Sequence, residues 1–365
     1  MIFKSKINYK ISQISFRIGI FFLVTAPVIS VGCFLISLVH TFSLHWRQIL
    51  LDKWNYLFFG ASFLMIIIAF IQSLEFNNLS LSIFEITDNT LNEEFVNWNS
   101  YSSLIGLSNW LPLFICYFGF QPYLSSSEDR RIVAKLLLAG SVPVVIYGFC
   151  QYWFDWDGKL EAMNGLIIWF QRRNGSGINS IFSNQNYAGC WLNIVLPFAL
   201  AFFCETTKNV FKKGSTLLFV ACIAFSSYIT TSRNAWGGIF LTIPLIFGPS
   251  YFYLIIPIFA FVGFLIFLKT FNLIPNNIDI LLNSLLPSKF NIFSQFSPDI
   301  YTEKIYNRDT IILFALRMIA KKPFVGMGAA TFPIYYNMQH DIYMGHAHNL
   351  IIDFAFSYGI VVALF

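Results

Sequence analysis

Long apolar runs, separated by short polar segments, limit the folds open to this chain more than any other feature of its sequence. A helix needs roughly 17 to 25 mostly apolar residues to cross the hydrocarbon core of a bilayer. Nine runs approach or reach this length, at residues 18–44, 56–74, 101–124, 132–154, 186–204, 215–231, 235–247, 251–268 and 349–365. The sequence therefore predicts an all-α fold, a polytopic transmembrane helical bundle of about nine or ten spans, with the lipid bilayer as a partner.

Composition excludes the main alternative classes. Hydrophobic residues make up 56% of the 365 residues and charged residues only 11%, whereas soluble domains carry about 25% charged residues. The apolar runs are continuous, which excludes the alternating pattern of a transmembrane barrel. The net charge of +5 is a mild excess that reports membrane topology, so no nucleic-acid partner is expected.

Basic residues in the short loops set the expected orientation, because lysine and arginine favour the cytoplasmic side of a membrane. The loops around Arg130 and Lys212 are therefore expected in the cytoplasm, and segments 155–185 and 269–348 outside it. The orientation of the N-terminal half is less determined. Either Pro27 kinks the first run into two half-helices and keeps the basic N-terminus inside, or the N-terminus lies outside.

The chain divides by this topology into a helical bundle over 1–268, a loop region outside the cytoplasm over 269–348 and a last span over 349–365 that stops within an apolar run. One amphipathic helix is predicted in the loop region, from 309 to 322, and Pro323 ends it. Its apolar residues at helical spacing are Ile311, Ile312, Ala315, Leu316 and Ile319. It is too charged to span, so it is expected to lie on the outer membrane surface.

Two arginines stand where a cation is costly. Arg233 lies between two apolar runs, at the edge of the hydrocarbon, and is either an interfacial anchor or a clamp whose planar fork suits phosphate oxygens. Arg308 opens the amphipathic helix, where its charge opposes the helix dipole. It either pairs with Asp309 or Glu303 or serves a ligand.

Three of the five histidines, His340, His346 and His348, lie shortly before the last apolar run. A neutral histidine that faces outward can accept a proton from a hydroxyl. A plain interfacial pair is the other interpretation. No metal site is predicted, because positions i and i+2 do not face one way on a helix and no cysteine joins them.

Other signals are weak or absent. The sequence has no nucleophile elbow, no zinc-protease helix and no phosphate-binding P-loop. The predicted spans contain almost no ionisable residues, which argues against a proton-driven pump. Arg172 and Arg173 precede a glycine-rich turn, and their simplest interpretation is a solvated loop.

Taken in order, four segments resemble the O-antigen ligase and polymerase superfamily of polytopic envelope proteins. They are Phe-Ser-Asn-Gln-Asn-Tyr-Ala-Gly at 182–189, Thr-Ser-Arg-Asn-Ala-Trp at 231–236, Arg308 with the stretch 315–332, and His-Ala-His-Asn-Leu at 346–350. Each piece is weak alone, and their order and spacing carry the resemblance.

The resemblance implies a glycosyltransferase-like ligase of the bacterial inner membrane that needs no metal or cofactor. It would move a glycan from a polyprenyl-diphosphate carrier to the hydroxyl of an acceptor glycolipid, such as the lipid A core, on the periplasmic face. Arg233 and Arg308 would bind the diphosphate, and His348 would be the general base, with His346 as the alternative. Residues implied to contact the sugar or support the site are Asn184 and Asn186, and Arg172 and Arg173 are weaker candidates for the same role.

Two departures weaken any statement about substrate. The family often has Asn-Pro-Asn where this chain has Asn-Gln-Asn at 184–186, and Ser-Arg-Gly where it has Ser-Arg-Asn at 232–234. Two other functions stay open. One is a polymerase that extends the glycan on its carrier, and the other is a non-enzymatic membrane protein associated with bicarbonate transport, whose relatives often lack the histidine.

Overall fold

The computed structural model describes residues 2–75, 99–156, 158–171, 177–205, 209–253, 308–340 and 342–365, with isolated residues between 256 and 268. Contacts divide the chain into two compact units. The first unit is Met1–His40 with Pro122–Ser297, and the second unit is Thr41–Gln121 with Pro298–Phe365. Each unit has a buried apolar core of its own.

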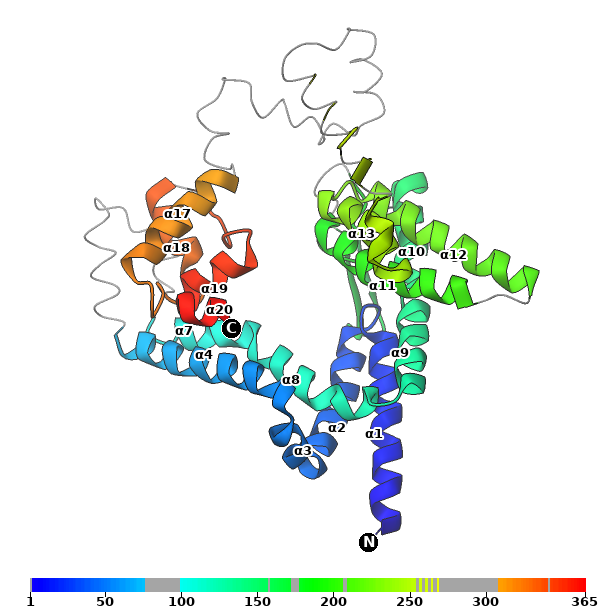
Figure 1. Cartoon of the computed structure of the whole chain (residues 1–365), viewed down its shortest axis with the longest axis horizontal. Helices are drawn as coiled ribbons and strands as arrows, with labels where there is room; N and C mark the ends of the chain where they lie inside the picture. Colours follow the sequence, from blue (N-terminus) through cyan, green and yellow to red (C-terminus); the bar gives the residue numbers. More distant parts are fainter. Residues whose placement is uncertain are drawn as a thin grey trace. The chain divides into compact units, whose positions relative to one another are not determined.

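Nearly all of the described elements are helices (Figure 1). Those that lie mainly in the first unit are α1 (Ile2–Phe22), α2 (Pro27–Leu44), α9 (Ser127–Gly140), α10 (Val142–Phe154), α11 (Gln185–Glu205), α12 (Val210–Ile229) and α13 (Arg233–Phe247), with the strands β1 (Gly158–Ala162) and β2 (Ile167–Gln171). Those of the second unit are α3 (Trp46–Leu51), α4 (Tyr56–Leu74), α7 (Ser102–Gly106), α8 (Leu111–Phe120), α17 (Arg308–Lys321), α18 (Phe332–His340), α19 (Leu350–Tyr358) and α20 (Ile360–Leu364). Short 3₁₀ turns occur at Lys53–Asn55, Leu107–Asn109, Gln121–Leu124 and Pro249–Tyr251.

Six helical segments of the described residues are long and apolar enough to cross a membrane. They are Pro27–Leu44, Lys53–Leu74, Ser102–Leu124, Ser127–Phe154, Gln185–Glu205 and Val210–Ile229. Each coincides with one of the predicted apolar runs, so the prediction of an all-α, polytopic helical membrane protein is confirmed. Of the other runs, 235–247 falls in α13, and most of 251–268 lies outside the described residues.

The last apolar run is not the single helix that the sequence suggests. Gly359 adopts a φ of +89° between α19 and α20, a conformation open mainly to glycine. The break lets the N–H of Ile360 donate to the carbonyl of Pro323 at 2.7 Å. The run 349–365 is therefore two short helices that are fixed to the segment after α17.

Pro27 reverses the chain, as its position within the first run suggested. Helices α1 and α2 lie antiparallel, because Ser30 Oγ donates to the carbonyl of Gly19 at 2.8 Å and Ser37 Oγ donates to that of Ser12 at 3.0 Å. Proline is well suited to the first position of a helix, where no N–H is needed. Whether the basic N-terminus faces the cytoplasm stays a prediction.

The remaining helices of the first unit pack around α11. Leu192 and Val195 of α11 and Ile223 of α12 are almost completely buried in a common core. Outside the helices, β1 and β2 form an antiparallel hairpin that the sequence analysis did not predict. The indole N–H of Trp169 in β2 donates to the carbonyl of Thr25 at 2.8 Å and so fixes the hairpin to the α1–α2 turn.

The second unit contains the predicted amphipathic helix, with a different buried face. Helix α17 spans Arg308–Lys321, close to the predicted 309–322. Ile311, Ala315 and Ile319 are buried as expected, but Leu316 is 47% exposed. The missed positions are Phe314 and Met318, which are buried against α18 and α19. The apolar face is thus covered by protein rather than by the membrane surface.

Candidate functional site

Two of the predicted site residues lie at the entrance of α19 and are held by hydrogen bonds on both sides. The N–H of Ala347 donates to Asp353 Oδ1 at 3.2 Å, and Asn349 caps the helix by accepting the N–H of Ile352 at 3.2 Å. His346 and His348 flank Ala347 in the chain, and the centroids of their rings are 4.4 Å apart. The histidine pair is therefore placed by the helix cap.

His348 has a backbone conformation that non-glycine residues rarely adopt. Its φ is +55°, in the left-handed region where a Cβ atom is crowded. Such strain persists only where surrounding contacts determine it, and it is common at functional sites. Here the bonds of Ala347 and Asn349 on either side hold the residue in place.

The environment of His348 favours its neutral form. Although the residue is exposed overall, its Nε2 lies 3.2 Å from Met344 Sδ. This partial burial first, and then the nearby His346 and Arg308, lower the pKa of His348 below its ordinary value. A neutral imidazole near pH 7 has one nitrogen able to accept a proton.

Arg308 lies close enough to His348 for their charges to interact, although 40 positions separate them in the sequence. It is the first residue of α17 and is exposed. Within the described residues, Arg308 forms no ion pair, so the suggested pairing with Asp309 is not seen, and Glu303 lies outside those residues. The structure therefore places Arg308 near His348, and the roles of both residues stay predictions.

Packing makes this entrance rigid. Phe332 of α18 contacts Phe314 of α17 and Phe356 of α19, with centroid distances of 5.7 and 4.9 Å. Gln72 of α4 is almost completely buried and donates to the carbonyls of Val325 and Ser357 at 2.7 and 2.8 Å. The sequence analysis missed Gln72. A glutamine within an apolar run was the signal that could have found it.

Arg233 occupies a comparable position in the first unit, as the exposed first residue of α13. Helices α11 and α13 run parallel, because Gly189 packs on Ser232 while Asn193 Nδ2, one turn later, donates to the carbonyl of Asn234 at 2.8 Å. Their N-termini therefore share one end. Helix N-termini attract anions, and an arginine beside two of them suits a phosphate.

The two predicted asparagines lie at the same end, Asn184 directly before α11 and Asn186 in its first turn. Asn184 Oδ1 accepts the N–H of Asn186 at 2.7 Å, so the side chain of Asn184 caps the first turn of α11. This bond gives Asn184 a structural role that the predicted sugar contact did not require. Asn186 is exposed. Arg172 and Arg173 lie outside the described residues, and their predicted role stays a prediction.

A buried polar network supports the segment that leads into α11. Gln151 Oε1 accepts the N–H groups of Asn179 and Ser180 at 3.1 and 2.7 Å, and Gln151 Nε2 donates to Asn179 Oδ1 at 2.8 Å. Gln185 Oε1 accepts the N–H of Gly177 at 3.2 Å. A Cβ on Gly177 would lie 1.9 Å from the carbonyl of Thr230. The loop thus needs glycine there.

The structure brings the predicted residues together within each unit. Arg308, His346 and His348 form one group in the second unit, and Asn184, Asn186 and Arg233 share one end of the first unit. Convergence of Arg233 with Arg308 and His348 on a common cavity stays a prediction. No group of three His, Cys, Asp or Glu side chains able to hold a metal occurs among the residues that the structure describes.

Comparison with known proteins assigns no family, since no family model and no curated protein matches the chain.

Proposed function

We propose that this membrane protein is a glycan transferase of the O-antigen ligase type. In this proposal it resides in a bacterial inner membrane with its active site in the periplasm. It moves a glycan from a polyprenyl diphosphate to an acceptor glycolipid, and so acts in lipopolysaccharide or related polysaccharide biosynthesis. The observation that carries the proposal is a neutral histidine, His348, held at a helix entrance near the guanidinium of Arg308, which forms no ion pair with any residue that the structure describes.

The proposed chemistry uses these groups in distinct roles. His348 accepts the proton of the acceptor hydroxyl, whose oxygen then forms the new bond to the anomeric carbon of the glycan. The bond from that carbon to the diphosphate breaks, and the negative charge passes to the leaving diphosphate. Arg308 and Arg233 hold this charge through the forked donors of their guanidinium groups. His346 lowers the basicity of His348 and is the alternative base.

The test is glycan transfer by the purified protein from a lipid-linked donor. His348→Ala should lower the rate by roughly 10² to 10⁴-fold, the usual contribution of general base catalysis. Arg233→Lys should also lower the rate of glycan transfer, because an ammonium cannot reproduce the guanidinium fork. The matched control is His45→Ala, which removes a half-buried histidine whose ring Nδ1 lies 3.1 Å from Gln48 Oε1.

The outcomes separate the competing functions. If His346→Ala abolishes transfer and His348→Ala does not, the base is His346. Full activity in the double variant, His346→Ala with His348→Ala, would exclude a histidine as the catalytic base. It would favour the non-enzymatic function associated with transport. Mass analysis of the surface polysaccharide in a deletion strain distinguishes ligase from polymerase, since a lost ligase leaves unattached chains of normal length and a lost polymerase leaves single repeat units.

A further inference from the structure

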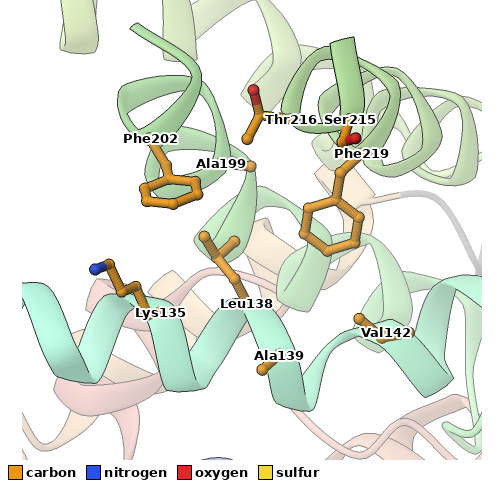
Figure 2. A pocket seen from close by; sticks show the side chains of 9 residues that line it. All are labelled: Lys135, Leu138, Ala139, Val142, Ala199, Phe202, Ser215, Thr216 and Phe219. Carbon is orange, nitrogen blue, oxygen red and sulfur yellow. The ribbon is translucent and has the colours of Figure 1, made fainter. Parts of the chain in front are cut away.

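A pocket of about 400 Å³ opens between α9, α11 and α12 of the first unit (Figure 2). Its wall is apolar, formed among others by Leu138, Ala199 and Phe219. Lys135 stands at its edge, with Nζ 5.6 Å from the ring centroid of Phe202. The pocket therefore combines a hydrocarbon-like interior with one cation at its rim.

Further cations stand at the same end of the helices. Lys212 precedes the pocket residues Thr216 and Phe219 of α12 by four and seven positions, so it shares their face. Lys213 lies with Nζ 5.7 Å from the ring centroid of Phe203. Lys135 therefore lines the pocket, Lys212 lies on the pocket-facing side of α12, and Lys213 lies nearby at the start of the same helix.

These lysines have no carboxylate partner among the described residues. Glu205, the last residue of α11, pairs instead with Arg131 at 2.6 Å. The two hydroxyls of the pocket donate to carbonyls of their own helix, Ser215 to Phe211 and Thr216 to Lys212, both at 3.0 Å. The ammonium groups are therefore the donors that remain for an anion.

The start of α12 has the composition of a bilayer interface. Val210 and Phe211 are 89% and 84% exposed and directly precede the two lysines. Lysines also oppose the dipole in the first turn of a helix, so their placement there does not stabilise the helix itself. Exposed apolar residues directly beside cations suit the boundary between headgroups and acyl chains.

We propose that this pocket binds one anionic phospholipid, with its phosphate at Lys135 and Lys212 and one acyl chain along Leu138, Ala199 and Phe219. The charge complementarity and the apolar wall select an amphiphile rather than a soluble anion. The basic loops that flank the pocket are those expected in the cytoplasm, and the cytoplasmic leaflet is rich in anionic lipids. The site is independent of the proposed glycan transfer.

The test is lipid binding by the purified full chain in detergent, with phosphatidylglycerol and phosphatidylcholine as probes and native mass spectrometry as readout. One phosphatidylglycerol should be retained in preference to phosphatidylcholine. Lys135→Gln should weaken this binding about fivefold, the contribution of one lysine near a membrane surface, and Lys135→Arg should keep it. Ala139→Phe, which fills the pocket from an exposed position of α9, should abolish retention.

Lys321→Gln is the matched control, because it removes the same charge from α17 of the second unit and should leave binding unchanged. Equal retention of both lipids would overturn the proposal. Equal losses in Lys135→Gln and Lys321→Gln would do so too, because they would indicate general surface charge. Retention of a polyprenyl phosphate but not of phosphatidylglycerol would also refute a phospholipid site. If Lys135→Gln does not fold, Ala139→Phe decides, and undiminished retention of phosphatidylglycerol by that variant would overturn the proposal.

Discussion

Gln72 joins three separate segments of the second unit, and its replacement tests how the histidine entrance is held. Its side chain is 1% exposed. Nε2 donates to the carbonyls of Val325 and Ser357 at 2.7 and 2.8 Å, and Oε1 accepts the N–H of Ala329 at 3.3 Å. Two of these partners lie in the segment after α17 and one lies at the end of α19. One side chain of α4 therefore holds both segments.

Gln72→Leu would leave two carbonyls and one N–H buried without this partner. A hydrogen bond within a membrane protein contributes about 0.6 kcal/mol on average, whereas an unsatisfied buried group costs about 1 to 3 kcal/mol. Three hydrogen bonds at the first value give about 2 kcal/mol, and three unsatisfied groups at the second give about 3 kcal/mol or more, so the free energy of local opening should fall by at least about 2 kcal/mol. Leucine has a similar volume, so cavity formation adds little.

Hydrogen exchange measured by mass spectrometry reports this loss directly. The N–H of Met327, bonded to the carbonyl of Phe356 at 2.7 Å, should exchange at least about 30-fold faster in Gln72→Leu. Ser62→Ala on the same helix is the control, because among the described residues Ser62 Oγ bonds only to the carbonyl of Phe59 in its own turn. An acceleration under about fivefold in the leucine variant would refute the argument that Gln72 joins these segments.

Two further predictions follow from particular residues. The pKa of His348 lies below its ordinary value of about 6.5, so the unfolded chain binds more protons, and stability from this group falls as pH drops through that value. His346→Gln removes a neighbour that lowers this pKa, so the acid limb of the transfer rate should move to higher pH, as a pH profile would measure; an unmoved limb would exclude His348 as base. Gly359→Ala should destabilise the fold in thermal unfolding by about 2 kcal/mol or more, because its Cβ would lie 2.2 Å from the carbonyl of Phe324. Gly32→Ala, with open space around it, should be neutral or slightly stabilising, and equal effects of the two would contradict the steric argument.

The positions of the six long apolar helical segments followed from the sequence because each apolar run has the length that a bilayer requires. The end of α17 was predicted because Pro323 cannot continue a helix. Its buried face was predicted only in part. A stripe with Ile312 and Leu316 and one with Phe314 and Met318 both fit a period of 3.6 residues, and contact with Phe332 and Phe356 selects the second.

The candidate site was predictable where the chemistry resides in local sequence. A histidine followed by a capping asparagine, and an arginine at the start of a helix, are visible without a structure. The roles of Gln72 and Gln151 were not found, because most of their partners are backbone groups, up to 285 positions away. A glutamine within an apolar run is visible in the sequence, but no local pattern reports its partners. The break at Gly359 was missed for a related reason, since its φ of +89° depends on packing against the segment after α17.

The division of the chain into two units allows the roles of the two arginines to be separated. Arg308 lies near His348 and lowers the pKa of that imidazole, whereas Arg233 begins α13 of the first unit. Arg308→Gln should therefore move the acid limb of transfer to higher pH as well as lowering the rate. Arg233→Gln should lower the rate and leave the limb in place.

Two measurements on the same variants check this separation. Titration of His348 by NMR in the absence of donor should show a raised pKa in Arg308→Gln, because a nearby positive charge has been removed. The same titration should be unchanged in Arg233→Gln if the two groups meet only through the diphosphate. A shift of equal size in both variants would mean that Arg233 acts on the histidine directly, and the assignment of Arg233 to the leaving group alone would then be wrong.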